Sequence, residues 1–417
     1  MDFYELMAAA ESLRGDSDTI DLSSGSPLVF EELSRIVLDE LAAPRWINAA
    51  TLGGYADYDG VPAFTELICA RWSSTFGRAL RPAEVMVTPG AQGALTLLRQ
   101  WLAESGRRIL YPLGVEYPGA VTHQDPASGV YESVRLGDGV CRVVLPNPEA
   151  LDWRRVGAVI LSQPHNPTTV AFTAQELQPL LSAARQHDAV TVFDRSYALP
   201  GAPMALDLPA LPPEAVHIFS FSKVGLASER TGVLIGPEEV VAQLRAVQRR
   251  MFIQAPKIGQ ALAAGLLDGL VAESASGALV GRAYRRRWDG LAAAMKETAG
   301  DVFADGKLLL HVWQGGPFLW AELHARTDIW EFAESCLRAG VIIMPGASLA
   351  VRPEVLPAPA FRLGLGKPTS VLIEAGVRLG RVLRAKPHRR GTSDEPRGTC
   401  DSATLDPTIV DGQEVEP

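Results

Sequence analysis

The sequence predicts an α/β fold with a large domain and a smaller α+β domain. The large domain is expected to hold a mainly parallel sheet of the seven-stranded type, flanked by helices. Short apolar runs without clean alternation are typical of strands buried on both faces, and here they alternate with stretches of helical periodicity. Toward the C-terminus several apolar runs surround one helical stretch, which indicates the second domain.

The elements of the large domain can be placed in chain order. VMVT at residues 85–88 leads into the helical stretch AQGALTLLRQWLAE. Thr173 and Glu176 form a capping box that marks the start of another helix, TAQELQPLLSAARQH. The remaining runs expected to be strands are RRILYP (107–112), VGAVILS (156–162), AVTVFD (189–194), VHIFSFS (216–222) and GVLIG (232–236).

The chain after residue 256 predicts the smaller domain and its link to the large one. Residues 256–296 have a helical pattern long enough to connect two domains. The runs LLLHVW, GPFLWAEL, VIIMP and FRLGL then predict strands around the helix DIWEFAESCLRAG. We expect residues 1–44 to form an N-terminal arm and part of the small domain, 45–285 the large domain, 286–384 the small domain, and 385–417 a disordered tail rich in Pro, Gly, Ser, Thr and charge.

Composition narrows the classes of partner. The 417 residues carry a formal charge of −9, and the pI is about 5.4. An acidic chain disfavours nucleic acid or an anionic membrane as partner. The four cysteines form no CxxC pair and no Cys/His metal spacing, so we expect no metal site and a reducing compartment. The N-terminus predicts no signal peptide and no segment is apolar enough to span a membrane, so a cytoplasmic location is expected.

Polar residues follow the predicted strands at the points where ligands bind in parallel sheets. Each has an ordinary alternative: Gly90 can simply open a strand–helix turn, Asn166 precedes a turn proline, and Asp194 can cap a helix. Together the set is Gly90, Ala91, Gln92, Tyr117, Asn166, Asp194, Tyr197, Ser220, Ser222, Lys223 and Arg230.

One ligand would use all these groups. A phosphate suits the glycine-containing helix start, the serines and Arg230. An aromatic ring suits Tyr117, and its protonated nitrogen suits Asp194. An aldehyde suits the Lys223 amine, which becomes nucleophilic when its pKa is lowered. These properties describe pyridoxal 5′-phosphate (PLP), so the sequence predicts PLP as cofactor.

The chain resembles the fold-type I, PLP-dependent class I/II aminotransferase family. The resemblance rests on Y-D-G at 58–60, T-P-G-A-Q-G-A at 88–94, H-N-P-T at 165–168, D-R-S-Y at 194–197, S-F-S-K-V-G-L…R at 220–230 and F-R-L-G at 361–364. Within the family the chain is most similar to valine–pyruvate aminotransferases, through IDLSSGSP, LYPLGVEYPG, SKVGLASER, GGPFLW and VIIMPG.

The resemblance implies a role for each motif residue. Lys223 would hold PLP and move the substrate proton, with Asp194 as partner of the ring nitrogen and Tyr117 stacked on the ring. Asn166 and Tyr197 would bind the ring oxygen. Arg362 would bind the substrate α-carboxylate, with Gly25 and Asn166 nearby. The phosphate would meet Gly90, Ala91, Gln92, Ser220, Ser222, Arg230 and, from the neighbouring subunit of a homodimer, Tyr58.

The implied activity is ping-pong exchange of an amino group between an L-amino acid, such as a valine- or alanine-like one, and a 2-keto acid. Departures from the family pattern keep other interpretations open: Thr169 stands where a glycine is usual, Ala63 stands near a second such position, and Arg195 follows Asp194. Arg195 is either a solvated loop charge or a contact to an acidic or phosphorylated substrate.

Two other functions are compatible with these residues. One is a PLP enzyme of specialised metabolism that catalyses elimination, γ-replacement or cyclisation of an amino acid instead of transamination. The other is a regulatory protein that keeps PLP without turnover. The regulatory interpretation predicts a DNA-binding segment, and the sequence has no basic helix–turn–helix pattern at either end.

Overall fold

The computed structural model describes residues 8, 11–12, 18–48, 53–55, 60–117, 119, 126–137, 139–205, 212–272, 276–324 and 328–385. Structural statements below refer to these residues. The predicted contribution of Tyr58 and the predicted disorder of residues 386–417 lie outside them. Among the described residues, no helix is both long and apolar enough to cross a lipid bilayer.

The larger sheet has seven strands in the order β2-β10-β9-β8-β7-β3-β4. Only β10 runs antiparallel to its neighbours, β2 and β9; the other pairings are parallel. Every residue of β7, β9 and β10 is buried, which explains why these strands lack an alternating pattern. The bounds are β2 Val85–Pro89, β3 Arg108–Tyr111, β4 Ala127–Ser128, β7 Val156–Ser162, β8 Val190–Asp194, β9 Val216–Ser220 and β10 Thr231–Ile235.

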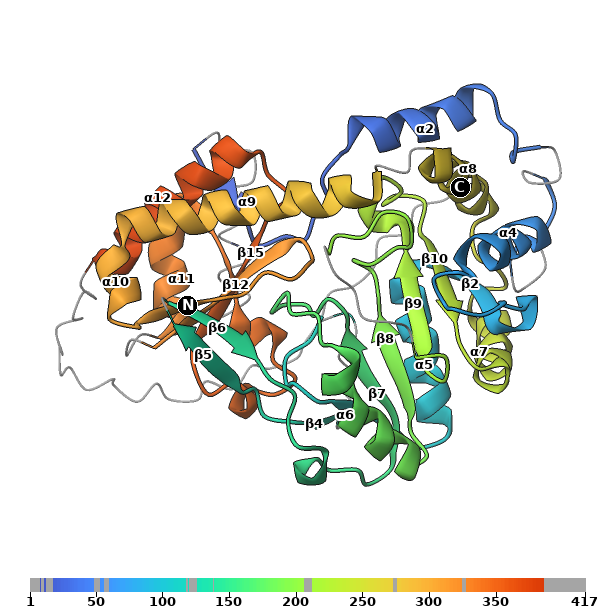
Figure 1. Cartoon of the computed structure of the whole chain (residues 1–417), viewed down its shortest axis with the longest axis horizontal. Coiled ribbons are helices and arrows are strands. Elements are labelled where there is room, and N and C mark those ends of the chain that lie inside the picture. The colour runs from blue at the N-terminus through green and yellow to red at the C-terminus, as the bar shows by residue number, and fades with distance from the viewer. Residues whose placement is uncertain are drawn as a thin grey trace, which may run out of the picture. The chain divides into compact units, whose positions relative to one another are not determined.

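Helices cover this sheet on both faces (Figure 1). One apolar cluster joins Met86, Ile218 and Leu234 of the sheet to α5 (Gly90–Glu104) and α7 (Glu238–Met251). Another joins neighbouring strand positions to α4 (Pro62–Trp72) and α8 (Lys257–Ala272). Near β7 and β8 the sheet packs on α6 (Ala174–Gln186), which begins with the predicted Thr173–Glu176 capping box.

The second sheet has six strands in the order β14-β15-β12-β11-β6-β5. The predicted C-terminal strands are present as β11 (Leu308–His311), β12 (Phe318–Leu323), β14 (Met344–Pro345) and β15 (Ala360–Gly364). The sheet also takes in β5 (Ser133–Gly137) and β6 (Val140–Val143), with β6 parallel to β11. This hairpin comes from the range expected to form the large domain. The chain leaves the larger sheet after β4, at residue 128, contributes β5 and β6 to the second sheet, and returns to the larger sheet at residue 156.

Helices α9 (Ser276–Thr298), α11 (Ile329–Arg338) and α12 (Thr369–Arg384) accompany this sheet (Figure 1). The remaining helices are α2 (Glu31–Ala42) and the short α10 (Gly300–Ala304). The N-terminal strand β1 (Ile20–Asp21) pairs in parallel with β13 (Val341–Ile342). Beyond β1 the backbone lies against β15, because Gly364 N donates to Leu22 O over 2.6 Å. A side chain at Gly364 would meet Ser24 O, so glycine permits this approach.

Candidate active site

The carboxyl ends of the central strands bring the predicted residues to one edge of the large sheet. Asp194 is the last residue of β8, and Asn166 lies in the loop after β7. Lys223 ends a short 3-10 helix, η3 (Phe221–Lys223), directly after β9, and Gly90 opens α5 after β2. Two residues from elsewhere in the chain reach the same place: Lys223 Nζ donates to Gly25 O, and Arg362 of β15 donates to Asn166.

An anion cradle lies at the start of α5. Gly90 has φ +71°, and a Cβ there would lie 2.7 Å from the guanidinium Nη2 of Arg230. Arg230 Nη1 donates to Ser222 Oγ over 2.9 Å, and Ser222 N donates to Ser220 Oγ over 3.2 Å. A helix N-terminus, an arginine and two hydroxyls are suited to a phosphate. Ala91 and Gln92 complete the first turn of α5, where Gln92 Nε2 donates to Gly119 O over 2.9 Å.

Asp194 presents one partnered and one available carboxylate oxygen. Its Oδ1 accepts hydrogen bonds from Ser196 N at 2.9 Å and Ser196 Oγ at 2.6 Å. No residue that the structure describes donates to its Oδ2. Burial raises the pKa of the Asp194 carboxyl, while Ser196 and the charge of Lys223 oppose that rise. A buried carboxylate with a free oxygen fits a protonated ring nitrogen.

Asn166 links Tyr197, predicted to bind the ring oxygen, to Arg362, predicted to bind the substrate carboxylate. Its Nδ2 donates to Tyr197 Oη over 3.1 Å, and its Oδ1 accepts from Arg362 Nη1 over 3.0 Å. Arg362 Nη2 donates to Ser23 O over 3.0 Å, and the guanidinium carbon lies 4.0 Å from the Phe318 ring centroid. Arg362 Nε is buried without a hydrogen-bond partner, and burial lowers the pKa of the guanidinium to about 10. The fork therefore has an unused donor.

Lys223 has the character expected of a nucleophilic amine. Its Nζ donates to Gly25 O over 2.8 Å. Burial, followed by repulsion from Arg362, lowers the pKa of this amine to about 8, although Asp194 acts in the opposite direction. At this pKa roughly a tenth of the amine is neutral at pH 7, far more than for an ordinary lysine.

Tyr117 lies in the segment after β3, with 36% of the residue exposed. Burial and then the charge of Asp194 raise the pKa of its hydroxyl, and Arg230 and Arg362 are near enough to lower it. The structure thus places Tyr117 among the residues predicted to bind the ring and the phosphate. Its stacking role stays a prediction.

Sequence reasoning missed Glu116, whose carboxyl is buried behind Tyr117. Only 2% of the residue is exposed, and the carboxylate accepts from Tyr117 N, Ser162 N and Ser162 Oγ. A single acidic residue in a loop resembles a solvated surface charge in sequence. One weak signal exists in the sequence: Glu116 is the single charged residue in the stretch LYPLGVEYPG at 110–119.

Arg195 is buried, so the interpretation as a solvated loop charge is wrong. Only 2% of the residue is exposed, and burial lowers the pKa of the guanidinium to about 9. The guanidinium carbon lies 5.9 Å from the Phe193 ring centroid, and Nε and Nη2 have no hydrogen-bond partner. Neighbouring strand residues alternate between faces, which places Phe193 on the face opposite Asp194. Arg195, over the Phe193 ring, is therefore directed away from the Asp194 side.

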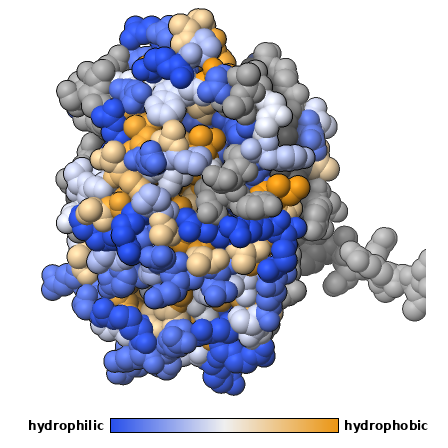
Figure 2. Space-filling model, turned by 90° about the vertical axis from the view of Figure 1, so that its right-hand side faces the viewer, coloured by the Kyte–Doolittle hydropathy of each residue, from blue (hydrophilic) through white to orange (hydrophobic). Residues whose placement is uncertain are grey.

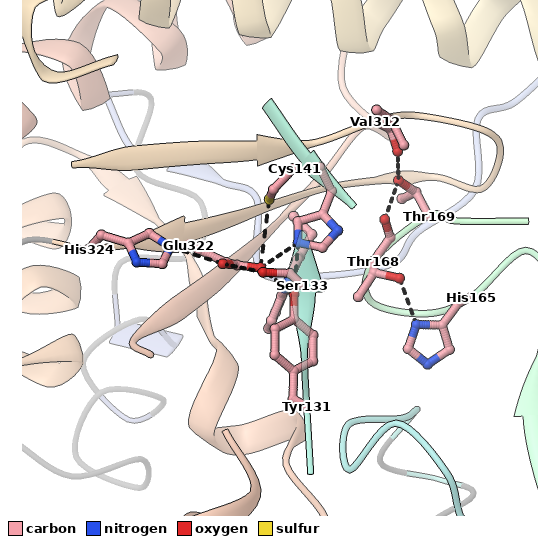
Figure 3. Close-up of polar contacts among 11 residues, drawn as sticks. Tyr131, Ser133, Cys141, His165, Thr168, Thr169, Val312, Glu322 and His324 are labelled. Atoms are coloured by element: carbon pink, nitrogen blue, oxygen red, sulfur yellow. Dashed lines mark hydrogen bonds and ion pairs between the residues drawn. The ribbon is translucent and has the colours of Figure 1, made fainter. Parts of the chain in front are cut away.

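Thr169 occupies a backbone conformation that favours glycine, with φ +63°. Its Oγ1 lies 2.6 Å from Thr168 O and 3.2 Å from Val312 O, which lies just beyond β11 (Figure 3). Gln314 N also donates to Thr169 O over 3.1 Å. The hydroxyl compensates for the strained backbone and connects the loop of Asn166 to the second sheet.

The second sheet contains a buried polar cluster around Glu322 (Figure 3). The Sγ of Cys141, an imidazole nitrogen of His311 and a carboxylate oxygen of Glu322 lie within 4.8 Å of one another. Glu322 Oε1 accepts from Tyr131 Oη at 2.6 Å and lies 2.7 Å from His311 Nε2. Its Oε2 accepts from Ser133 Oγ at 2.9 Å and lies 3.0 Å from His324 Nε2. Both oxygens are thus engaged by hydrogen bonds, which brace β5, β6, β11 and β12 against one another.

The residues present fit PLP on structural grounds. The cradle at Gly90 admits a phosphate where a side chain would fill the space, and Asp194 Oδ2 is available to a protonated nitrogen. The charges of Arg230, at the phosphate cradle, and of Asp194 both influence the pKa of Lys223, so the lysine lies near both of these residues. A mainly parallel sheet with this set at its carboxyl edge defines a PLP-dependent enzyme of the aminotransferase fold.

Comparisons with known proteins identify the family. The family model for aminotransferase class I and II matches residues 138–376, and the chain belongs to this family. Members of the family are PLP-dependent, and the protein is accordingly a PLP-dependent aminotransferase.

Three similar proteins illustrate the range of the family. A valine–pyruvate aminotransferase of Escherichia coli is 25% identical over 78% of this chain and 81% of the relative. A probable aspartate/prephenate aminotransferase of Thermus aquaticus is 25% identical over 71% of this chain and 76% of the relative. The crystal structure of a putative amino-acid aminotransferase of Psychrobacter arcticum superposes with a TM-score of 0.81 at 21% identity, covering 92% of this chain and 95% of that one.

Proposed function

We propose that the enzyme transfers the amino group of a small aliphatic L-amino acid, such as valine or alanine, to a 2-keto acid by a ping-pong mechanism. The observation that carries this proposal is the convergence of Lys223, Asp194 and Arg362 on one strand-end edge. The motifs shared with valine–pyruvate aminotransferases support the aliphatic substrate. The E. coli relative of that name aligns over most of the chain.

Arg362 would bind the substrate α-carboxylate. Its guanidinium is already oriented by Asn166 Oδ1, Ser23 O and the Phe318 ring, and it keeps Nε unused. Two parallel N–H···O bonds would fix the carboxylate in one orientation. Gly25 contributes by leaving room, because a Cβ there would lie 2.9 Å from Phe318 Cζ.

Lys223 would take the proton from the substrate α-carbon and deliver it to the cofactor carbon on the other side of the substrate nitrogen. The buried, partly neutral amine is suited to general acid–base catalysis near neutral pH. Asp194 Oδ2 would hold the proton on the cofactor ring nitrogen, and Asn166 with Tyr197 would bind the ring oxygen. Bound PLP supplies the electron sink for the α-carbon. Gly90, Ala91, Gln92, Ser220, Ser222 and Arg230 would bind the phosphate.

We further propose a cytoplasmic homodimer without nucleic-acid or membrane partners. The acidic net charge of −9 supports the absence of polyanionic partners. Large apolar side chains are exposed at Val29, Leu38 and Leu41 in or beside α2 and at Ile258 in α8. The face that includes these helices shows hydrophobic groups among hydrophilic ones (Figure 2). Exposed apolar groups of this kind suit a second subunit. Light scattering of the purified protein tests the dimer.

The proposed function is tested with single amino acids and keto acids. The wild-type protein is expected to be yellow when loaded with PLP, to lose that colour when an L-amino acid donor is added, and to release the matching keto acid. K223A should show neither change, whereas K307A, at an exposed lysine paired with Asp305, should behave as wild type. Loss of an activated amino acid without exchange to a keto acid would instead favour elimination, replacement or cyclisation.

A further inference from the structure

Glu116 is a buried carboxyl group without a cationic partner. Its Oε1 accepts from Tyr117 N at 2.9 Å and Ser162 Oγ at 2.6 Å, and its Oε2 accepts from Ser162 N at 2.9 Å. Among the described residues, no arginine or lysine forms an ion pair with it. Three neutral donors partly replace the lost hydration, but an isolated buried carboxylate is costly without a counterion.

The hydrogen bonds of Glu116 extend to the residues that would hold the cofactor ring. Ser162 Oγ, which contacts Glu116, also accepts from Asn166 N over 2.8 Å. Tyr117 N contacts the same carboxylate directly. One side chain therefore fixes the backbone of Tyr117 and, through Ser162, that of Asn166. Ser162 and Asp194 are register partners across β7 and β8, which brings the two carboxyl groups into one region.

The groups that face Glu116 disfavour the simultaneous ionisation of Glu116 and Asp194. Asp194 repels it, and Tyr197 is near enough for its own pKa to respond to Glu116. His165 Nε2 lies 3.7 Å from Glu116 Oε2, but burial lowers the pKa of His165 to about 3, so this imidazole is neutral. Two nearby carboxyls in a low-dielectric site tend to retain one proton between them.

The position of the cations decides which carboxyl retains the proton. Burial raises the pKa of both carboxyls, to about 8 at Glu116. At Asp194 the charge of Lys223 opposes that rise, whereas no lysine or arginine among the described residues forms an ion pair with Glu116. We propose that Glu116 is a positioning residue that fixes Tyr117 and Asn166 and carries the proton of this two-carboxyl pocket, so that Asp194 stays ionised. The inference rests on the proposed function for the pairing of Asp194 with the cofactor, but the proton on Glu116 can be tested without it.

The first test uses apo-protein and the variant E116Q, which cannot ionise. A carboxyl whose pKa is higher in the folded state than in the unfolded state stabilises the fold at low pH, and this contribution is lost as pH rises through the folded pKa. The melting temperature of E116Q minus that of wild type should therefore rise by a few degrees from about pH 5.5 to about pH 8.5. A difference that stays constant over this range would overturn the proton assignment.

The second test measures PLP uptake by the apo-proteins through absorbance titration and the spectrum of the bound cofactor. E116A leaves three donors without an acceptor and should weaken PLP binding about tenfold, with a shifted absorbance maximum. E116Q should retain two of the three hydrogen bonds and lie between E116A and wild type. E40Q is the control, since Glu40 is buried and accepts from Arg45 N and Trp46 N in a different region.

The outcomes of these tests distinguish failure of the role inferred for Glu116 from failure of the proposed function. Unchanged PLP affinity and spectrum in E116A, or equal losses in E116A and E40Q, would overturn the positioning role. Wild-type protein that never binds PLP would overturn the proposed function, while the melting-temperature series in apo-protein would still decide where the proton resides.

Discussion

The strained backbone at Thr169 leads to a prediction about the order of two substitutions. Thr169 has φ +63° and compensates with a hydroxyl that lies 3.2 Å from Val312 O. T169A keeps the unfavourable conformation and loses the hydroxyl, whereas T169G loses the hydroxyl but relieves the strain. A left-handed conformation costs a residue with a Cβ about 1–2 kcal/mol, and the larger freedom of unfolded glycine offsets about 0.4–1 kcal/mol of the relief.

The net expectation is that T169G is more stable than T169A by about 1 kcal/mol. T169A should be less stable than wild type, because the hydrogen bond to Val312 O contributes about 0.5–1.5 kcal/mol. In T169G the relief of strain offsets this loss, so T169G should lie close to wild type. Urea denaturation followed by tryptophan fluorescence gives the midpoints, and T169S serves as the control that keeps the hydroxyl. If T169A proves as stable as T169G, the conformation at position 169 is not strained. If T169A proves as stable as T169S, the hydroxyl does not compensate for the strain.

Three further predictions concern the active site and the second sheet. The rate of PLP uptake by apo-protein should rise with pH and level off above about pH 8. Uptake needs the neutral Lys223 amine, and burial lowers the pKa of this amine to about 8. The rate is measured by stopped-flow absorbance, and a rate that does not change with pH would contradict this expectation. G25A should lower kcat/KM for amino donors at least about tenfold, because its Cβ would lie 2.9 Å from Phe318 Cζ and displace the carbonyl that accepts from Lys223; steady-state kinetics unchanged from wild type would contradict this contact. E322Q should lower the free energy of unfolding by about 1–3 kcal/mol through loss of an acceptor for Tyr131 or His311, and equal urea midpoints for E322Q and wild type would exclude that role.

The large sheet and most of the site are predictable from the sequence for one physical reason. Strands buried on both faces appear as continuous apolar runs, and parallel strands bring their carboxyl ends to one edge. The strand-end positions of Lys223, Asp194 and Asn166 therefore predict that these side chains lie together. Arg362 and Gly25 came from the family resemblance, because no local pattern connects residues so far apart in sequence.

The β5–β6 hairpin and the burial of the titratable side chains Glu116 and Arg195 could not be predicted in the same way. All residues of β5 are exposed or half-buried, so the strand has no apolar run, and its place in the second sheet depends on the distant β11. Glu116 and Arg195 look like loop charges in sequence. Their burial is decided by which loops cover them, and that is a tertiary property.

The main chain near the N-terminus has a consequence for turnover. Gly25 O and Ser23 O already accept hydrogen bonds from Lys223 and Arg362. A substrate carboxylate that binds Arg362, as proposed, would displace the Ser23 carbonyl oxygen from the guanidinium, and when it leaves the carbonyl would accept from Arg362 again. Such a swap limits how tightly any one substrate is held. In a ping-pong enzyme the first product must leave before the second substrate binds, and weaker binding of its carboxylate speeds that release.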